Sequence, residues 1–260
     1  MITEEKLKVP PTIFRTIHKS SEQSEKAWAQ GPKIEILSSY SSEQKPGCAT
    51  SFVELVEFLG SDLTVVNAAR VSFGKEKIEF DDNDEKLLNF LARHNHWTPF
   101  SQPQIQLRFK MPFFVARQYF KHTVGLTRNE VSRRYVRNTP ELWLPKYFRE
   151  GAENVKQGSA ETIHPENLLI TDMVYQQGLE AIALYEQMLD MGICAEQARS
   201  VLPVSTMTEF VETGSLAAYA RIYGLRFEKT AQKEIQDFAI AIGQHCHSLF
   251  PKAWEAILNS

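Results

Sequence analysis

The sequence predicts an α+β fold made of a single domain, with helices packed around a small mixed sheet. Two segments, Gln104–Lys110 and Val204–Glu212, alternate apolar and polar residues as half-buried strands do. Most other apolar segments repeat with helical spacing. A chain of 260 residues is long enough to bury one large hydrophobic core. We expect an N-terminal extension at residues 1–32 and the domain itself at residues 33–260.

In the first half of the chain, the residues before about 45 are polar and weakly periodic, and they contain one predicted strand at Lys33–Leu37. Phe52–Gly60 has helical apolar spacing and ends at a glycine, so we predict a helix there. Asp84–His94 repeats the same spacing and predicts a second helix. The strand Gln104–Lys110 then leads into a helix at Pro112–Lys121, whose proline suits a first turn.

In the second half, a loop containing Gly125 follows that helix and could wrap around a ligand. Pro140–Pro165 is rich in Gly, Asn and Pro and predicts a long loop or lid, with room for a short helix. The remaining predicted elements are helices at Asp172–Met191, Ser215–Tyr223 and Thr230–Phe250, a helical turn or two at Ala195–Leu202, and the strand Val204–Glu212.

The composition is that of a reduced, cytoplasmic protein. Lys and Arg total 29 against 32 Asp and Glu, so no global field attracts nucleic acid or membrane. Cys48, Cys194 and Cys246 are odd in number and form no Cys-x-x-Cys pair, which argues for free thiols. The N-terminal residues contain no apolar run resembling a signal peptide, and no later run approaches the ~20 apolar residues of a membrane span, so we expect a soluble protein.

The segment Arg117–Tyr135 stands out because of its charge. It contains several arginines, a lysine and a histidine but a single carboxylate, Glu130. A solvated helix face usually carries both signs of charge, so this excess favours an anionic ligand such as a phosphate. A basic surface patch without a ligand is the alternative interpretation.

Several blocks of the sequence resemble the flavin-dependent thymidylate synthases in order and approximate spacing. The six blocks are Asn67–Phe73, His96–Phe100, Arg117–His122, Asn129–Tyr135, Ala198–Pro203 and Gly224–Arg226. The Asn-Glu-x-Ser-x-Arg-Tyr pattern at Asn129–Tyr135 is the most specific of them. The resemblance covers the chain from about Lys33 onward and leaves the N-terminal extension outside it.

This resemblance implies an enzyme that makes dTMP from dUMP. In the family, methylenetetrahydrofolate donates the carbon, reduced FAD donates the hydride, and NADPH reduces the flavin. The family's sites lie between the subunits of a homotetramer, so the resemblance implies that assembly as well. A monophosphate and the pyrophosphate of FAD both need cationic partners, which agrees with the charge of Arg117–Tyr135.

The resemblance also assigns site residues. Those expected to bind dUMP are Gln118, Glu130, Ser132, Arg133, Arg134, Arg199 and Arg226. Those expected to bind the flavin are Ser72, Thr98, Lys121, His122, Thr123 and Glu130. The expected catalytic residues are Arg226, which stabilises negative charge on the uracil ring, His96, which lies near flavin and pyrimidine, and, as a lesser possibility, Ser132 as a nucleophile.

The chain departs from the family pattern at the flavin loop. Lys121-His122-Thr123 stands where the family usually has Arg-His-Arg, and the stretch from there to Ser132 is one residue longer. Lys supplies a point charge rather than a fork, and Thr supplies only a hydroxyl. Arg128 is our candidate to restore the lost charge. No cysteine has the Pro-Cys-His neighbourhood of conventional thymidylate synthases, as a flavin hydride route requires no protein thiolate.

Three alternatives remain open at this stage. The altered loop is compatible with an enzyme of the same fold that transfers a hydroxymethyl group or acts on another pyrimidine nucleotide. The cationic segment alone is compatible with a non-catalytic nucleotide- or RNA-binding protein. Arg70 could either pair near a helix end or contact a ligand. We expect no metal site at the His-x-His pairs at His94 and His245, because residues i and i+2 face apart on a helix.

Overall fold

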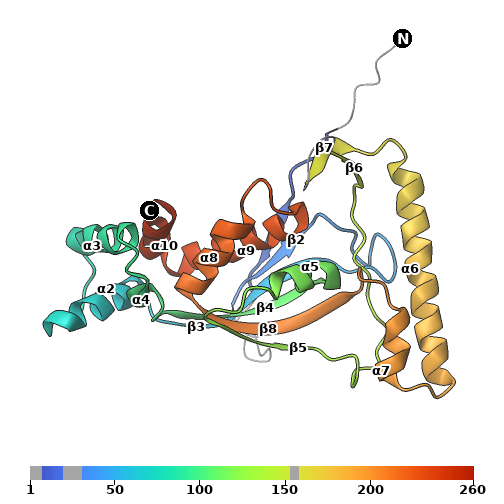
Figure 1. The fold of residues 1–260 in the computed structure, drawn as a ribbon, viewed down its shortest axis with the longest axis horizontal. Coiled ribbons are helices and arrows are strands. Elements are labelled where there is room, and N and C mark those ends of the chain that lie inside the picture. The colour runs from blue at the N-terminus through green and yellow to red at the C-terminus, as the bar shows by residue number, and fades with distance from the viewer. Residues whose placement is uncertain (1–7, 20–30, 153–157) are drawn as a thin grey trace, which may run out of the picture.

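The computed structural model describes residues 8–19, 31–152 and 158–260, and its central element is a six-stranded sheet in the order β1-β2-β3-β4-β8-β5 (Figure 1). The strands of this sheet are β1 (Phe14–Ile17), β2 (Lys33–Ile36), β3 (Ser51–Leu59), β4 (Gln104–Pro112), β5 (Leu126–Glu130) and β8 (Met207–Ser215). A second sheet pairs β6 (Arg149–Gly151) with β7 (Ser159–Ile163). The α+β prediction is confirmed, although neighbouring strands of the main sheet pair antiparallel throughout rather than in a mixed arrangement.

Helices cover one face of this sheet and both of its ends. The helices of the described chain are α2 (Asp62–Arg70), α3 (Asp82–Arg93), α4 (Trp97–Phe100), α5 (Phe113–Tyr119), α6 (Asn167–Asp190), α7 (Ala195–Ala198), α8 (Leu216–Arg226), α9 (Lys233–Leu249) and α10 (Pro251–Leu258), with 3-10 turns η1 (Val71–Phe73) and η2 (Arg199–Val201). Figure 1 shows α5, α8 and α9 on one face, α2 to α4 with α10 at one end, and the long α6 at the other.

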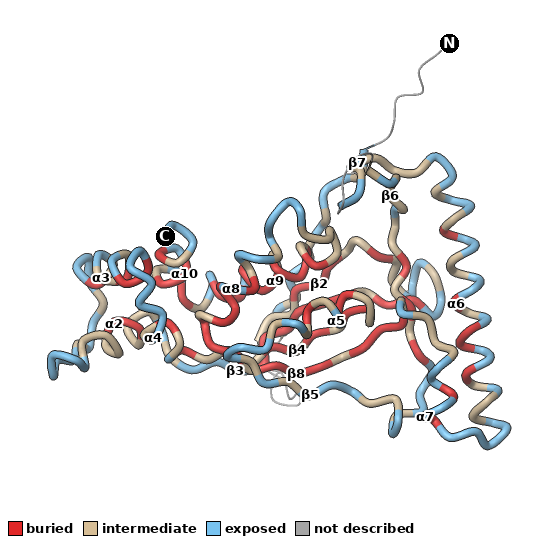
Figure 2. Tube along the Cα trace, viewed as in Figure 1, coloured by how far each residue is buried: buried red, intermediate tan, exposed pale blue. Residues whose placement is uncertain are grey.

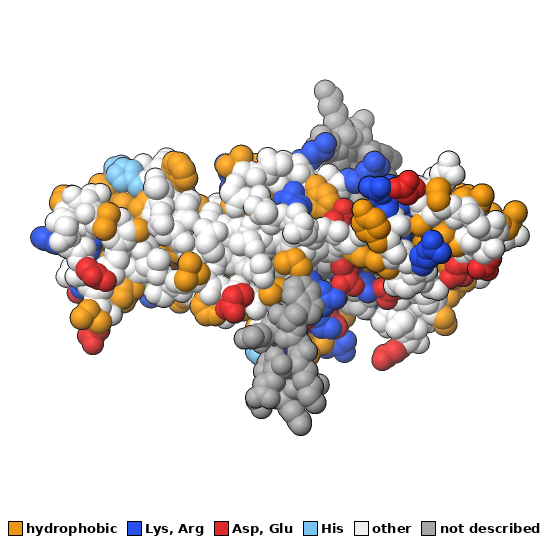
Figure 3. Space-filling model, turned by 90° about the horizontal axis from the view of Figure 1, so that it is seen from below, with side chains coloured by type: hydrophobic (Ala, Val, Ile, Leu, Met, Phe, Trp, Pro, Cys, Tyr) orange, Lys and Arg blue, Asp and Glu red, His pale blue; other side chains and the backbone are white. Residues whose placement is uncertain are grey.

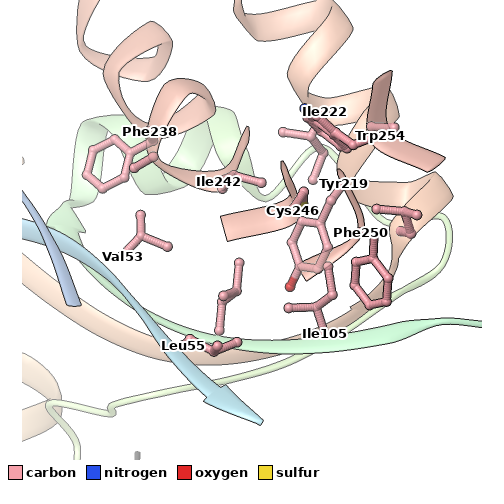
Figure 4. Close-up of a cluster of buried hydrophobic side chains, with 14 of the residues drawn as sticks. Val53, Leu55, Ile105, Tyr219, Ile222, Phe238, Ile242, Cys246, Phe250 and Trp254 are labelled. Carbon is pink, nitrogen blue, oxygen red and sulfur yellow. The ribbon is translucent and has the colours of Figure 1, made fainter. Parts of the chain in front are cut away.

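The core lies between the sheet and the helices on that face. Ile105, Leu107 and Phe109 of β4 are completely buried, as their alternation predicts. The Phe109 ring stacks on Phe210 of β8 with ring centroids 4.8 Å apart. Figure 4 shows sheet side chains meeting those of α8, α9 and α10, and Figure 2 shows buried residues concentrated along the strands and inner helix faces. This packing fixes α5, β5 and α8 relative to one another.

The other face of the sheet carries paired charges. Arg108 of β4 donates to Glu54 of β3 at 3.1 Å and contacts Glu209 of β8, and Lys110 pairs with Glu141. Figure 3, which views the molecule from this side, shows basic and acidic side chains next to one another. These cations therefore have protein partners of opposite sign.

Phe52–Gly60 is a strand rather than the predicted helix. Ser51–Val56 is buried at every position because β3 lies between β2 and β4 and under α9. A β-bulge between Leu55 and Glu57 shifts the register and interrupts the alternation. A short apolar run with an irregular period cannot be assigned to a helix or a strand by spacing alone.

Other predicted segments agree with the structure or add strands to it. The helices at 84–94, 112–121, 172–191, 215–223 and 230–250 and the strands at 33–37, 104–110 and 204–212 are confirmed within a few residues. The loop predicted after α5 instead contains β5, which pairs with β8. The long loop at 140–165 contains β6 and β7 and no helix among its described residues. Within the N-terminal extension, β1 pairs with β2, while residues 1–7 and 20–30 lie outside the described chain. Among the described helices, none combines the length and apolar character needed to cross a membrane.

The stacked pair of β4 and β8 gives a test of the core. Phe109→Ala should lower the free energy of unfolding by about 3–5 kcal/mol, because it removes a completely buried aromatic ring and leaves a cavity. Phe73→Ala, at a side chain that is 77% exposed, is the matched control and should change it by less than about 0.5 kcal/mol. Urea denaturation followed by circular dichroism measures both. Equal effects of the two substitutions would contradict this description of the core.

Candidate active site

A cavity lined by cationic side chains lies where α5, the end of β5 and η2 meet. We call it the basic pocket; its volume is about 430 Å³, within the range of small-molecule sites. Its polar lining consists of Arg117, Glu130, Ser132, Arg133 and Arg199, and its apolar lining includes Phe113 and Phe120. The pocket thus combines three guanidinium groups with one carboxylate.

Two of these arginines have no anionic partner in the described part of the chain. Among the described residues, the side chains of Arg117 and Arg199 make no hydrogen bond and no ion pair, and both are exposed. Arg133 donates to the backbone carbonyl of Asn138 at 2.6 Å, and no carboxylate of the described residues pairs with it. Uncompensated guanidinium groups around one cavity favour an anion that accepts several hydrogen bonds, such as a phosphate.

The carboxylate of the basic pocket is held by the neighbouring strand. Thr208 of β8 donates its hydroxyl proton to Oε1 of Glu130 at 2.7 Å. The hydroxyl of Ser132 accepts the backbone N–H of Arg134 at 3.3 Å. The second oxygen of Glu130 and the hydroxyl hydrogen of Ser132 are therefore available to a ligand.

A second group of residues surrounds His122, at the end of α5. Arg226 of α8 donates its Nε–H to Nε2 of His122 at 2.9 Å. Burial lowers the pKa of His122 to about 4, and the charges of Arg226, Arg128 and Arg221 act in the same direction. The ring is therefore neutral at pH 7, with its proton on Nδ1. Lys121 and Thr123 flank it and are exposed.

A buried ion pair holds this loop in place, and we call it the Arg128–Glu212 clamp. Arg128 of β5 donates its Nε–H to Glu212 at 2.6 Å, and its terminal nitrogens donate to the carbonyls of Phe120 at 3.3 Å and His122 at 2.6 Å. Glu212 is completely buried and also accepts the Tyr119 hydroxyl at 2.6 Å. Burial raises the pKa of Glu212, while the bonds from Tyr119 and Arg128 oppose that rise. All three guanidinium nitrogens of Arg128 have protein partners, so the structure does not support our expectation that Arg128 restores a lost flavin contact.

A smaller, mostly apolar cavity lies beside α8, and we call it the tryptophan pocket. It has a volume of about 220 Å³. Its wall includes His96 and Trp97 at the start of α4, Ala217, Ala220 and Arg221 on one face of α8, and Ser260. Trp97 is 66% exposed, so its indole is accessible to a ligand. An apolar cavity with an exposed indole and a cation suits a flat aromatic molecule that carries phosphate.

The structure divides the predicted site residues among several places. Glu130, Ser132, Arg133 and Arg199 meet in the basic pocket, and His96 lines the tryptophan pocket. Arg226 and His122 contact each other and line neither cavity.

The remaining predicted residues line neither of these cavities. Arg134 pairs with Glu196, with 2.6 Å between Nε and Oε1. Gln118 of α5 has a buried side-chain oxygen without a hydrogen-bond partner in the described chain. Ser72 and Thr98 are exposed.

Some relevant residues were missing from the predicted site. Arg117 lines the basic pocket, and its signal was present, because Phe113, Ala116, Arg117 and Phe120 follow the i, i+3, i+4, i+7 spacing of one helix face. No local pattern in the sequence indicated Arg221 or Glu212, because each lies near residues that are distant in the sequence. Glu212 is the partner of Arg128.

Other candidate polar residues have structural roles. Arg70 contacts the completely buried Asp84, so it forms a structural ion pair. His245 is buried and bonds to the carbonyl of Val53 at 3.1 Å, and burial lowers its pKa to about 4. Among the described residues, no group of three His, Cys, Asp or Glu side chains is arranged to hold a metal ion.

Comparisons with known proteins place this chain among related sequences and structures. A family model described as thymidylate synthase complementing protein matches residues 54–252. The chain is 34% identical to a flavin-dependent thymidylate synthase of Thermosipho melanesiensis over 212 residues, which covers 80% of this chain and 90% of the relative. It is 37% identical to a protein of the same description from Thermus thermophilus over 205 residues, covering 79% and 74%.

Two solved structures also align with this chain. A UMP/dUMP methylase from Streptomyces cacaoi bound with 5-Br dUMP aligns with a TM-score of 0.72 and 27% identity, covering 80% of this chain and 95% of that chain. The same methylase bound with 5-Br UMP aligns with a TM-score of 0.71 and 26% identity, covering 80% and 94%.

The His122–Arg226 contact predicts a pH response. The pKa of His122 is about 4 in the folded protein, against an ordinary 6.5 in the unfolded chain. The unfolded chain therefore takes up a proton on His122 at a higher pH than the folded protein does. The stability that the neutral ring contributes above pH 6.5 is lost as the pH falls toward 4. Arg226→Ala removes one of the repelling charges and should raise the pKa of His122 while burial still holds it below 6.5. NMR titration of labelled histidine rings measures it. His245 is the internal control, because no arginine contributes to its shift, and it should not move. An unchanged His122 pKa in the variant would contradict the contact.

Proposed function

This chain belongs to the thymidylate synthase complementing protein family, and we propose that it methylates dUMP to dTMP with methylenetetrahydrofolate as carbon donor and NADPH-reduced FAD as hydride source. Its relatives are named flavin-dependent thymidylate synthases, so it is an enzyme of the methyltransferase class rather than a non-catalytic binding protein. The reduced flavin, when bound, supplies the hydride. The side chains of this protein bind the nucleotide, orient it and stabilise the charge that develops on its ring.

The observation that carries the proposal is the set of unpaired arginines in the basic pocket. A nucleotide monophosphate is a dianion near neutral pH, and Arg117 and Arg199 have no anion of their own in the described chain. We assign the phosphate to these arginines and to the Ser132 hydroxyl. Glu130, held by Thr208, then accepts a hydrogen bond from the sugar or the base through its free oxygen.

Arg226 is the proposed catalytic residue. Its Nε–H is directed to His122, which leaves the two terminal nitrogens to contact a uracil ring. A fixed cation at the N3 and O4 edge stabilises negative charge there and makes C5 a better nucleophile. The neutral His122 ring contributes by orienting that guanidinium without adding a competing positive charge.

The cysteines support a route without a protein thiolate. Cys48 and Cys246 are buried, and burial raises the pKa of Cys48 to about 11 and that of Cys246 further. Cys194 is exposed but lines neither the basic pocket nor the tryptophan pocket. These thiols are therefore poorly suited to attack the pyrimidine, as expected where a flavin supplies the reducing equivalent. No base lies within hydrogen-bond distance of the Ser132 hydroxyl in the described chain, which disfavours Ser132 as a nucleophile.

We propose that complete sites form between subunits of a homotetramer. Arg117 and Arg199 line the basic pocket, whereas Arg226 contacts His122 and lines neither of the two cavities, so the groups that the reaction needs do not meet in one described cavity of a single chain. An arrangement in which two subunits face each other would bring the basic pocket of one chain and Arg226 of another to one ligand. The exposed flavin loop and the exposed Trp97 would be covered in the same assembly.

UMP is a second candidate substrate. A related solved structure is described as a UMP/dUMP methylase and contains 5-Br UMP in one case and 5-Br dUMP in another. The alternative of hydroxymethyl transfer concerns the product rather than the substrate, and mass spectrometry of the product distinguishes it.

Tritium release from [5-³H]dUMP and from [5-³H]UMP, with FAD, folate and NADPH supplied, tests the proposal. Wild type should release tritium from dUMP. Arg199→Ala should raise the KM for dUMP by about 10- to 100-fold, because it removes a charge-assisted contact to the phosphate. Arg226→Ala should lower kcat by about 100- to 1000-fold, because it removes the cation that stabilises charge on the ring. Arg93→Ala, at an exposed arginine that lines neither pocket, is the control. Absence of release by wild type would overturn the function, and full activity of Arg226→Ala would overturn its catalytic role.

A further inference from the structure

The flavin loop lacks the cations that a dinucleotide needs. A pyrophosphate carries two negative charges, and of the three loop residues Lys121, His122 and Thr123 only Lys121 is cationic at pH 7. Arg128 is fully bonded within the clamp. Arg226 already has one bond to His122 and is assigned to the pyrimidine. If FAD binds here, another cation has to balance the pyrophosphate.

Arg221 of α8 is the side chain that meets this need. It is exposed, and among the residues that the structure describes its guanidinium has no ion pair and no hydrogen bond. It lines the tryptophan pocket, and its positive charge also acts on His122. Arg221 is therefore close to two parts of the chain near which the flavin is expected: it shares a cavity with His96, which directly precedes the Trp97–Thr98 turn, and its charge reaches His122 of the flavin loop.

The wall next to Arg221 suits an aromatic ring. Ala217, Ala220 and Arg221 share one face of α8, at positions i, i+3 and i+4, so two small side chains leave space below the guanidinium. Trp97 also lines this cavity, and its indole is accessible. Asn95, which precedes His96 and also lines the cavity, has a φ of 55°, the one positive φ at a non-glycine residue of the described chain. This left-handed residue ends α3 and turns the chain toward the cavity.

We propose that Arg221 binds the pyrophosphate of the flavin cofactor at the mouth of the tryptophan pocket and supplies the guanidinium that Lys121-His122-Thr123 does not. The proposal rests on the function proposed above, and it makes Arg221 a cofactor-binding residue that does not take part in the hydride transfer. It explains how a loop with one cation can serve a dinucleotide. It also predicts that affinity for the flavin depends on the phosphate groups more than on the ring.

Titration of the flavin-free full-length protein tests this directly. The ligands are FAD, FMN and riboflavin, which have a pyrophosphate, a monophosphate and no phosphate, and binding is followed by flavin fluorescence. Arg221→Gln should weaken FAD binding by about tenfold or more, as expected for a lost charge-assisted contact. It should leave riboflavin binding unchanged. Arg221→Lys should recover part of the FAD affinity, because it restores a charge without the fork. Arg93→Gln is the matched control and should bind all three ligands as wild type does.

Each outcome supports or overturns the proposal. Equal FAD affinity in wild type and Arg221→Gln would overturn it. Equal loss for FAD and riboflavin would also overturn it, because the effect would then come from packing against the ring. A loss confined to NADPH, titrated separately against the FAD-loaded protein, would assign Arg221 to the reductant instead and overturn the flavin assignment. If wild type binds no FAD at all, the proposed function itself is wrong. If wild type binds FAD and Arg221→Gln binds it equally well, only the assignment of Arg221 is wrong.

Discussion

The Arg128–Glu212 clamp is the interaction on which both halves of the site depend. Glu212 is completely buried on β8, and Arg128 reaches it from β5, two residues before Glu130. The same guanidinium donates to the carbonyls of Phe120, which lines the basic pocket, and of His122, which bonds to Arg226. One buried ion pair therefore fixes the end of α5 and β5 together. Removing either partner would leave a charge buried without a counter-ion, which is far more costly than losing a surface pair.

The charges of this chain follow two different rules. On the open face of the sheet, cations such as Arg108 and Lys110 are paired with carboxylates, and such pairs need no ligand. Around the basic pocket and along α8, Arg117, Arg199 and Arg221 have no anion in the described chain. Arg117 and Arg199 lie around one cavity and Arg221 lines the other, and all three side chains are exposed, where water screens their mutual repulsion. In the function proposed above, anionic ligands balance these charges, and a neighbouring subunit contributes to the same site.

Sequence alone predicted the parts of this protein that depend on local pattern. The alternation of β4, the helical spacing of α5 and the order of the family blocks identified the sheet, the helix and the basic pocket residues Ser132 and Arg199. Sequence-based predictions were wrong where contacts between distant segments determine the secondary structure or the role of a residue. Phe52 belongs to a strand because β2 and β4 flank it, and its spacing carried no sign of that. The ion pair of Arg128 joins it to Glu212, 84 residues away, so sequence spacing gives no sign that the cation we considered as a replacement charge for the flavin loop has a protein partner.

The central claim is that one catalytic site combines Arg199 of one subunit with Arg226 of another. Co-expression of Arg199→Ala and Arg226→Ala chains, followed by the tritium-release assay on the purified mixed oligomers, tests it most directly. If the two chains mix at random, about a quarter of the shared sites contain both an intact Arg199 and an intact Arg226. The mixture should therefore recover roughly a quarter of wild-type activity. Each variant expressed alone should stay nearly inactive. If the mixed oligomers are as inactive as the single variants, both arginines act from the same subunit, and the account of a shared site is contradicted.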